Sequence, residues 1–131
     1  IHMRRPTYLS ALMNNTKWRE VLSLVGRMGE RFEVAYIWEE RFQPALPPAE
    51  DQLKETHIAD PGIAGGPAEY IDIYSIRIPK TIWAQNPKTG EKLPSTEKSD
   101  RFLTEAAKLG LLPLEIKDDF IYVYGYSHRN P

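Results

Sequence analysis

The sequence predicts an α+β fold, with an antiparallel sheet of about four to six strands and two main helices packed on one face. Two stretches have apolar residues at helical spacing, several short stretches alternate between apolar and polar residues, and tight turns join most of the latter. Strands joined by tight turns pair antiparallel, so the helices are expected to cover one side of the sheet. With 131 residues, a single domain over residues 1–131 is expected.

The first helix is predicted to begin after Asn14, because Asn14, Asn15 and Thr16 carry side-chain oxygens that cap helix N-termini. The apolar residues that follow at helical spacing are Trp18, Val21, Leu22, Val25 and Met28. Gly29 is placed to close the helix, and Gly26 is expected to weaken its last turn by about 1 kcal/mol relative to alanine.

The residues before this helix give a weaker pattern. Ile1-His2-Met3 is typical of a tag remnant, and Met3 is the expected natural start. Residues 7–13 are expected to form either a short apolar helix or an arm that lies on the core.

Residues 32–39 alternate with period two and are rich in aromatic and β-branched side chains, so they are predicted to form one strand that ends before Pro44. Residues 43–69 are then expected to form a long loop rich in proline, glycine and acids, with a short helix allowed over 50–58. A loop of this length in a compact domain is uncommon and tends to be functional or mobile.

Residues 70–78 are predicted to form the next strand, in which the apolar parity switches between Ile73 and Ile76. The switch indicates either two buried faces or a β-bulge. A hairpin is predicted to follow over residues 81–93, because Asn86-Pro87-Lys88-Thr89-Gly90 has the composition of a tight turn.

The second helix is predicted from Ser95 or Ser99 to Leu109, with Gly110 at the position of a closing glycine. A final hairpin is predicted with strands over 112–116 and 120–126. Both faces of the last strand are apolar enough for an interior place in the sheet.

The composition excludes several chemistries. Hydrophobic residues make up 41% and charged residues 27%, as in globular proteins, and the net charge of −1 gives no reason to expect nucleic acid as a partner. The lack of cysteine excludes disulfides, thiolate metal sites and cysteine nucleophiles, and it fits a cytoplasmic protein. No apolar run is long enough to cross a membrane, and no cofactor is expected.

The charges are unevenly distributed along the chain. Residues 33–72 carry nine acidic and two basic groups, a net charge of −7, whereas residues 1–32 carry +4 and residues 73–131 carry +2. The acidic stretch is expected to be either a solvated loop or an anionic surface that docks a basic protein partner. The candidate partner-binding residues are Glu39, Glu40, Glu50, Asp51, Glu55, His57 and Asp60.

Two other functions remain open at this stage. A small hydrolase or metal-dependent enzyme would use His57 with nearby carboxylates, although the sequence has no HExxH motif or second ligand of recognisable spacing. A ligand-binding domain would place its pocket under residues 62–67. Alternating Tyr122, Tyr124 and Tyr126 could stack on bases, but core and cross-strand packing explains them more economically.

Two short motifs carry a resemblance to a known group of proteins. Asn15-Thr16-Lys17-Trp18-Arg19-Glu20 and the closing Ile121-Tyr122-Val123-Tyr124-Gly125-Tyr126 resemble a family of short bacterial proteins of unknown function, with an "NxTKW" helix start and a "YGY" final strand. The match covers about residues 14–126. The family implies no activity, and in size and lack of chemistry the chain also resembles immunity proteins of bacterial toxin–immunity pairs, which implies a protein-binding role.

Overall fold

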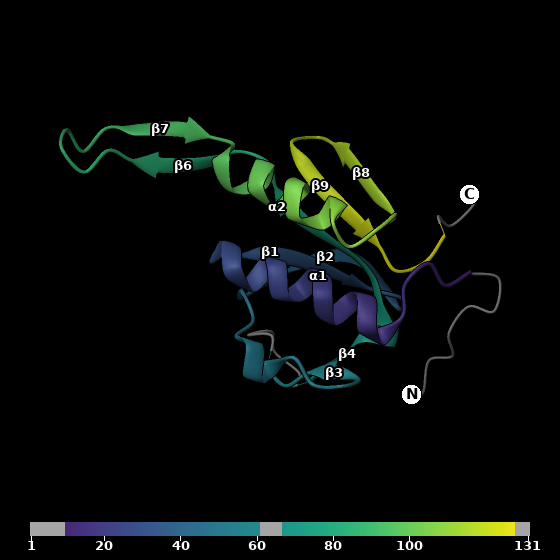
Figure 1. Cartoon of the computed structure of the whole chain (residues 1–131). Helices are drawn as coiled ribbons and strands as arrows, with labels where there is room; N and C mark the ends of the chain where they lie inside the picture. Colours follow the sequence, from purple (N-terminus) through teal and green to yellow (C-terminus); the bar gives the residue numbers. More distant parts are fainter. Residues whose placement is uncertain (1–9, 61–66, 128–131) are drawn as a thin grey trace.

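A computed structural model describes residues 10–60 and 67–127, apart from the side chain of Glu40, and confirms the predicted α+β fold (Figure 1). A five-stranded antiparallel sheet has the strand order β2-β1-β5-β9-β8, and both helices lie on one of its faces. The helices are α1 (Asn15–Met28) and α2 (Glu97–Ala107). The strands of the main sheet are β1 (Phe32–Tyr36), β2 (Glu39–Ala45), β5 (Ile73–Pro79), β8 (Leu114–Lys117) and β9 (Phe120–Tyr124).

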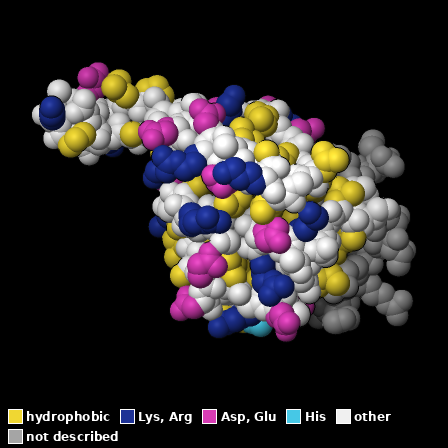
Figure 2. All heavy atoms as spheres, in the orientation of Figure 1, with side chains coloured by type: hydrophobic (Ala, Val, Ile, Leu, Met, Phe, Trp, Pro, Cys, Tyr) yellow, Lys and Arg dark blue, Asp and Glu magenta, His cyan; other side chains and the backbone are white. Residues whose placement is uncertain are grey.

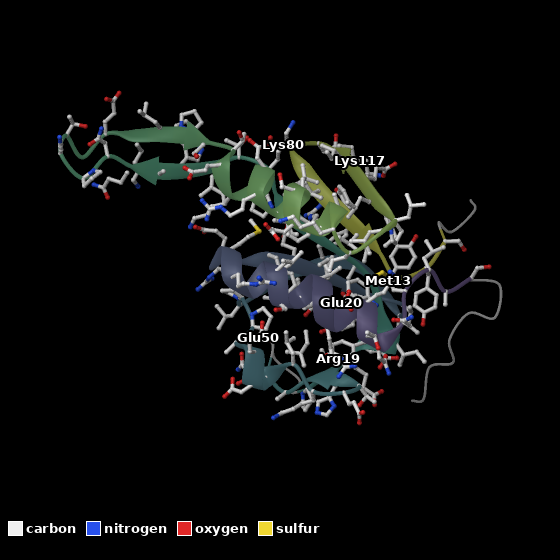
Figure 3. All side chains as sticks on the ribbon, viewed as in Figure 1. Met13, Arg19, Glu20, Glu50, Lys80 and Lys117 are labelled. Atoms are coloured by element: carbon white, nitrogen blue, oxygen red, sulfur yellow. The ribbon has the colours of Figure 1, made fainter. Side chains whose placement is uncertain are left out.

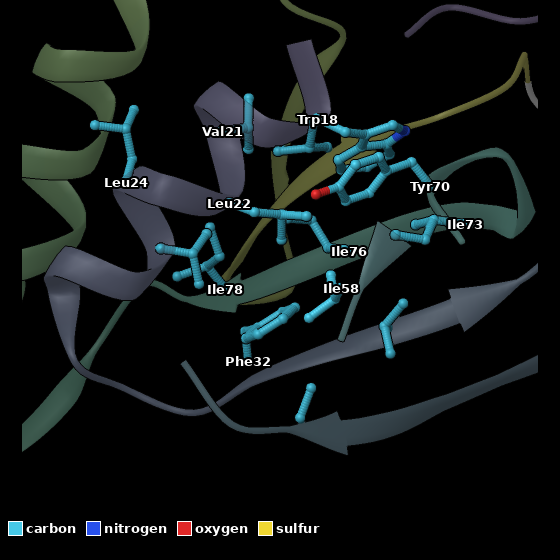
Figure 4. Packing of buried hydrophobic residues seen from close by; sticks show 14 of the residues in the cluster. Trp18, Val21, Leu22, Leu24, Phe32, Ile58, Tyr70, Ile73, Ile76 and Ile78 are labelled. Carbon is cyan, nitrogen blue, oxygen red and sulfur yellow. The ribbon is translucent and has the colours of Figure 1, made fainter. Parts of the chain in front are cut away.

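Helix α1 begins and ends where the sequence predicts. The Asn14 Oδ1 accepts a hydrogen bond of 2.8 Å from the backbone N–H of Lys17, and Gly29 closes the helix with φ of 70°. The apolar face of α1 packs on isoleucines of the central strands, as Figure 4 shows for Leu22, Ile76 and Ile78. Burial of this face supplies most of the stability of such a helix.

The central strand β5 contains a β-bulge, one of the two alternatives that the parity switch indicated. Ala35 of β1 pairs with Ser75, but the next residue, Tyr36, pairs with Ile73. One extra residue, Tyr74, therefore lies on β5, and this β-bulge switches the apolar parity. Ser75 is fully buried, and its hydroxyl donates to the carbonyl of Val123 at 3.1 Å.

The prediction of one strand over residues 32–39 is wrong. Residues 32–36 form β1, a turn at Ile37 and Trp38 reverses the chain, and β2 runs back along it through Pro44. Proline is tolerated there because β2 is an edge strand, where a missing backbone N–H leaves no ladder bond unmade.

The prediction that residues 43–69 form a loop without strands is also wrong for its described part. This part contains the end of β2 and three short elements that pack against α1 (Figure 1). The elements are the 3₁₀ turn η1 (Glu50–Gln52) and the paired strands β3 (His57–Ile58) and β4 (Ala68–Glu69). A further 3₁₀ turn, η2 (Tyr70–Asp72), precedes β5, so the strand predicted from residue 70 begins at Ile73.

The predicted hairpin over residues 81–93 is confirmed as strands β6 (Ile82–Gln85) and β7 (Lys92–Ser95). It projects away from the main sheet and both helices (Figure 1). The buried Ser99 of α2 fixes its root, because the Ser99 hydroxyl donates to the carbonyl of Lys80 at 2.7 Å, and Figure 3 places Lys80 at this junction.

The two ends of the described chain lie together. Ala11 forms an isolated antiparallel bridge with Tyr126, so residues 10–13 take the arm form of the two predicted alternatives; residues 7–9 lie outside the described residues. Within residues 10–60 and 67–127, no helix has the length and apolar character that crossing a membrane requires.

Candidate functional site

The candidate acidic residues gather mainly on one folded segment, residues 50–60 with Glu69, called here the acidic segment. Its backbone is closed by hydrogen bonds from Lys54 N–H to the His57 carbonyl (2.9 Å) and from Ala59 N–H to the Gln52 carbonyl (2.8 Å). Antiparallel pairing of β3 with β4 attaches the segment to the chain that leads into β5. Because of these bonds the segment is a folded surface, and not the open loop that the sequence predicted.

Apolar side chains, one within the acidic segment and two next to Glu69, anchor the segment to the core. Ile58, Ala68 and Tyr70 are 2%, 5% and 0% exposed. The Tyr70 hydroxyl donates to the Lys54 carbonyl at 2.7 Å, and burial raises the pKa of Tyr70 to about 12. The segment is therefore held against α1 with its apolar side chains inward.

The carboxylates of the acidic segment point outward. Its five acidic side chains are all exposed, and they are Glu50, Asp51, Glu55, Asp60 and Glu69. Elsewhere among the described residues, six carboxylates form ion pairs, including Glu30 with Lys98 and Glu97 with Arg101. Within the described part of the chain, Glu50, Asp51, Glu55 and Glu69 form no such pair. Glu50 accepts a hydrogen bond from the Ser23 hydroxyl of α1 instead.

Two of the candidate residues lie elsewhere. Glu39 belongs to β2 of the main sheet, where its carboxylate pairs with Arg41 at 3.1 Å and accepts a hydrogen bond of 3.1 Å from Gln43. Glu40 is in the same strand, and its side chain lies outside what the structure describes. The candidate set is thus divided between the sheet edge and the acidic segment.

His57 lies on β3 and is partly exposed, with Nδ1 at 3.1 Å from the Thr56 hydroxyl. Among residues 10–60 and 67–127, no three histidine, aspartate or glutamate side chains lie close enough together to hold a metal ion. The predicted pocket under residues 62–67 lies almost wholly outside the described residues.

A groove of about 450 Å³ lies on the surface where α1 meets the acidic segment. Figure 3 labels three residues that flank it, Arg19, Glu20 and Glu50. Its lining residues are Thr16, Arg19, Glu20, Ser23, Arg27, Glu50, Leu53 and Leu109. The groove is lined by both acidic and basic side chains. It therefore offers polar contacts beside the acidic surface, but its own electrostatic potential is not dominated by one sign of charge.

A second groove of about 430 Å³ lies between α1 and α2, and a third of about 230 Å³ lies at the root of the β6–β7 hairpin. The two grooves share Lys98 and Arg101. Figure 2 shows several basic side chains over this part of the molecule, interspersed with acidic ones. His57 lines none of the three grooves.

The face of the sheet opposite the helices carries a stacked cluster that the sequence analysis missed. The Arg77 guanidinium lies between the rings of Phe42 and Phe120, at 4.2 and 4.3 Å from their centroids. It also donates to Glu33 at 2.7 Å and to the Tyr122 hydroxyl at 3.2 Å. The residues of this cluster come from four strands. The one sequence signal that could have indicated the cluster is that, within each strand, these residues occupy the alternate positions facing away from the helices.

The tyrosines of β9 lie on this same face. The rings of Tyr122 and Tyr124 stack at 5.8 Å with 8° between their planes, and each residue is 6% exposed. Burial is the main reason that the pKa of Tyr124 is raised, to about 12, and its hydrogen bond to Glu115 adds to the effect. These rings are engaged in packing within the sheet face.

Comparisons with family models, with curated proteins and with solved structures found no match for this chain.

Proposed function

We propose that this protein acts by binding another protein, and that it docks a basic partner on the acidic segment. The single observation that carries the proposal is the set of exposed carboxylates at Glu50, Asp51, Glu55 and Glu69, which form no ion pair within the described residues. An immunity protein that neutralises a basic toxin is the form of this function that the sequence resemblance implies.

The physical case rests on long-range charge. Between residues 50 and 60 the chain carries four acidic side chains against one lysine, which makes this surface strongly negative near pH 7. Such a surface attracts a cationic protein before contact and raises the association rate. Because salt screens exposed charges over about 10 Å at 0.1 M, the effect is expected to weaken as ionic strength rises.

The anchoring of the segment strengthens the case. Ile58 and Tyr70 hold the backbone in place, so a partner does not have to order a free loop when it binds. A preorganised surface loses less conformational entropy on binding than a flexible one. The lack of cysteine supports a cytoplasmic setting for this binding.

The test compares two charge-reversed proteins. Asp51→Lys/Glu55→Lys changes two exposed carboxylates whose side chains form no hydrogen bond or ion pair with other described residues. Glu91→Lys/Asp100→Lys makes the same change in net charge at exposed positions outside the acidic segment. The binding probe is the purified product of the gene that neighbours this protein's own gene.

We expect the Asp51/Glu55 variant to lower the association rate about tenfold, and the matched control to lower it far less. Stopped-flow or surface plasmon resonance at two salt concentrations measures both rates. Binding that ignores the charge reversals and the salt, or the absence of binding, contradicts the proposal.

A further inference from the structure

The β6–β7 hairpin is a two-stranded sheet that no other part of the described chain covers as a second layer. Trp83 is 66% and Leu93 50% exposed, and the remaining side chains of both strands are exposed or only partly buried. Figure 1 shows the hairpin extending beyond the helices and the main sheet. An isolated hairpin of this size is marginally stable in water, so additional pairing or packing would stabilise it.

The hydrogen-bond pattern shows which backbone groups face outward. Trp83 pairs with Pro94, and proline has no N–H to donate, so this must be a pair without hydrogen bonds. Antiparallel ladders alternate, and the bond from Asn86 N–H to the Glu91 carbonyl (2.8 Å) sets the same phase from the other end. The N–H and C=O groups of Trp83 and Gln85 therefore point away from β7, and no bond joins them to another described residue.

The two edges of the hairpin differ in their protection. Strand β7 carries a lysine and a proline, Lys92 and Pro94, which are the residues that block unwanted strand pairing. Strand β6 reads Ile82-Trp83-Ala84-Gln85 and contains neither a charge nor a proline. The edge of β6 is thus open to another strand.

We propose that β6 pairs antiparallel with β6 of a second copy of this chain, across a two-fold axis at Ala84. In this register Trp83 of each copy lies opposite Gln85 of the other, and the two residues exchange both backbone bonds. Four hydrogen bonds form, and they satisfy every outward-facing group of Trp83 and Gln85.

The residue on the axis fits this arrangement. Ala84 directs its own N–H and C=O to Leu93, so the two Ala84 residues face each other as a pair without hydrogen bonds, where backbones approach to about 4.5 Å. The small side chain suits this close approach. The strand is uncharged, so its pairing with a copy places no like charges opposite each other. The product is a four-stranded sheet that joins the two hairpins.

Cysteine cross-linking tests this register, because these 131 residues include no cysteine. In Ala84→Cys the two thiols should lie opposite each other, within the Cα separation of about 4.4–6.8 Å that a disulfide requires. We expect mild oxidation to convert this variant to a covalent dimer on a non-reducing gel. Thr89→Cys, an exposed position in the hairpin turn, is the control and is expected to cross-link at least about tenfold more slowly.

A pair of proline variants tests the pairing without a covalent bond. Gln85→Pro removes one outward N–H from the β6 edge, so two of the four bonds are lost, and the hairpin keeps its own ladder. Lys92→Pro is the matched control, because Lys92 faces Gln85 in the ladder and presents its N–H on the opposite edge. Sedimentation velocity over a concentration series is expected to show a monomer–dimer equilibrium whose dissociation constant Gln85→Pro raises roughly tenfold or more. Lys92→Pro is expected to leave it within about twofold.

Three results would overturn the proposal. They are a wild-type chain that stays monomeric at every concentration, an Ala84→Cys variant that cross-links no faster than Thr89→Cys, and equal weakening by the two prolines. None of these results bears on the acidic segment, so the binding of a basic partner stands or falls separately.

Discussion

The acidic segment and the β6–β7 hairpin both leave the main sheet and return to the body of the protein, but only the acidic segment is anchored in the core. Ile58 and Tyr70 are 2% and 0% exposed, whereas Trp83 and Leu93 are 66% and 50% exposed. Each region contains both apolar and charged residues. The difference lies in where the apolar side chains go.

This difference determines what each region presents to a partner. The acidic segment uses its apolar side chains in folding, so charge is what remains on its outer surface. The hairpin keeps its apolar side chains and the backbone groups of one edge on the outside. The first surface suits attraction at long range, and the second suits recognition by strand pairing and close packing.

The largest expected effect is a loss of stability when the anchor is truncated. Ile58→Ala is expected to lower the free energy of unfolding by about 2–5 kcal/mol, because it leaves a cavity in the core. Leu93→Ala in the hairpin is the matched truncation and is expected to change it by less than about 0.5 kcal/mol. Urea unfolding followed by circular dichroism measures both, and equal losses would mean that the two regions are equally anchored.

A second test concerns the chain that leads into the acidic segment. A Cβ added at Gly26 of α1 would clash with the backbone carbonyl oxygen of Pro48. Gly26→Ala is therefore expected to destabilise the protein by about 1–3 kcal/mol through overpacking. Helix propensity alone predicts that the substitution raises the free energy of unfolding by about 1 kcal/mol. The sign of the measured change therefore shows whether the close approach of Pro48 or helix propensity dominates. Arg27→Ala, exposed in the same turn, is the control.

High pH offers a third and smaller effect. Tyrosines of the unfolded chain ionise near pH 10, whereas burial raises the pKa of Tyr70 to about 12. The unfolded chain thus releases its proton first, and stability is expected to fall as the pH rises from about 10 toward 12. Tyr70→Phe should make this fall shallower. Urea unfolding midpoints at pH 9 and pH 11 measure the pH dependence of stability in both proteins. If Tyr70→Phe leaves this dependence unchanged, the raised pKa of Tyr70 is contradicted. Tyr124→Phe provides the same test for a tyrosine on the other face of the sheet.

The smallest expected effect is on a residue of the exposed β6–β7 hairpin. Trp83→Ala is expected to change the free energy of unfolding of the monomer by less than about 0.5 kcal/mol, because the side chain has few contacts to lose. Thermal unfolding of a dilute sample measures this. A loss of several degrees in the melting temperature would instead show that the indole supports the fold.

The parts of the fold that depend on local rules could be predicted from the sequence. The cap at Asn14, the closing glycine at Gly29 and the turn around Pro87 each follow from the backbone preferences of a few adjacent residues. The parity switch between Ile73 and Ile76 indicated two alternatives, two buried faces or a β-bulge, and the structure has the bulge. These signals lie within one element, so they do not require knowledge of its neighbours.

The parts that depend on distant partners could not be predicted. Pro44 was taken as the end of a strand because its place at the sheet edge is a property of the assembled sheet. Ile58 and Ala68 are isolated apolar residues without a period, and they are buried in a core cluster whose other members come from helices and strands distant in sequence. Glu50, Asp51 and Glu55 are exposed, which fits both alternatives for the acidic stretch, a solvated surface and a docking surface. The stack on Arg77 was missed because it joins residues from strands far apart in sequence.

The Arg77 stack has a consequence for the margin of the sheet. Strand β2 has a single neighbour in the ladder, but Phe42 also contacts an arginine that belongs to β5, two strands away. The guanidinium thus fastens the outermost strand to the middle of the sheet over the top of β1. No helix of the described chain covers this face of the sheet, and the stacked side chains of Phe42, Arg77 and Phe120 provide the packing there. Separation of the edge strand from the sheet therefore requires that this stack open first.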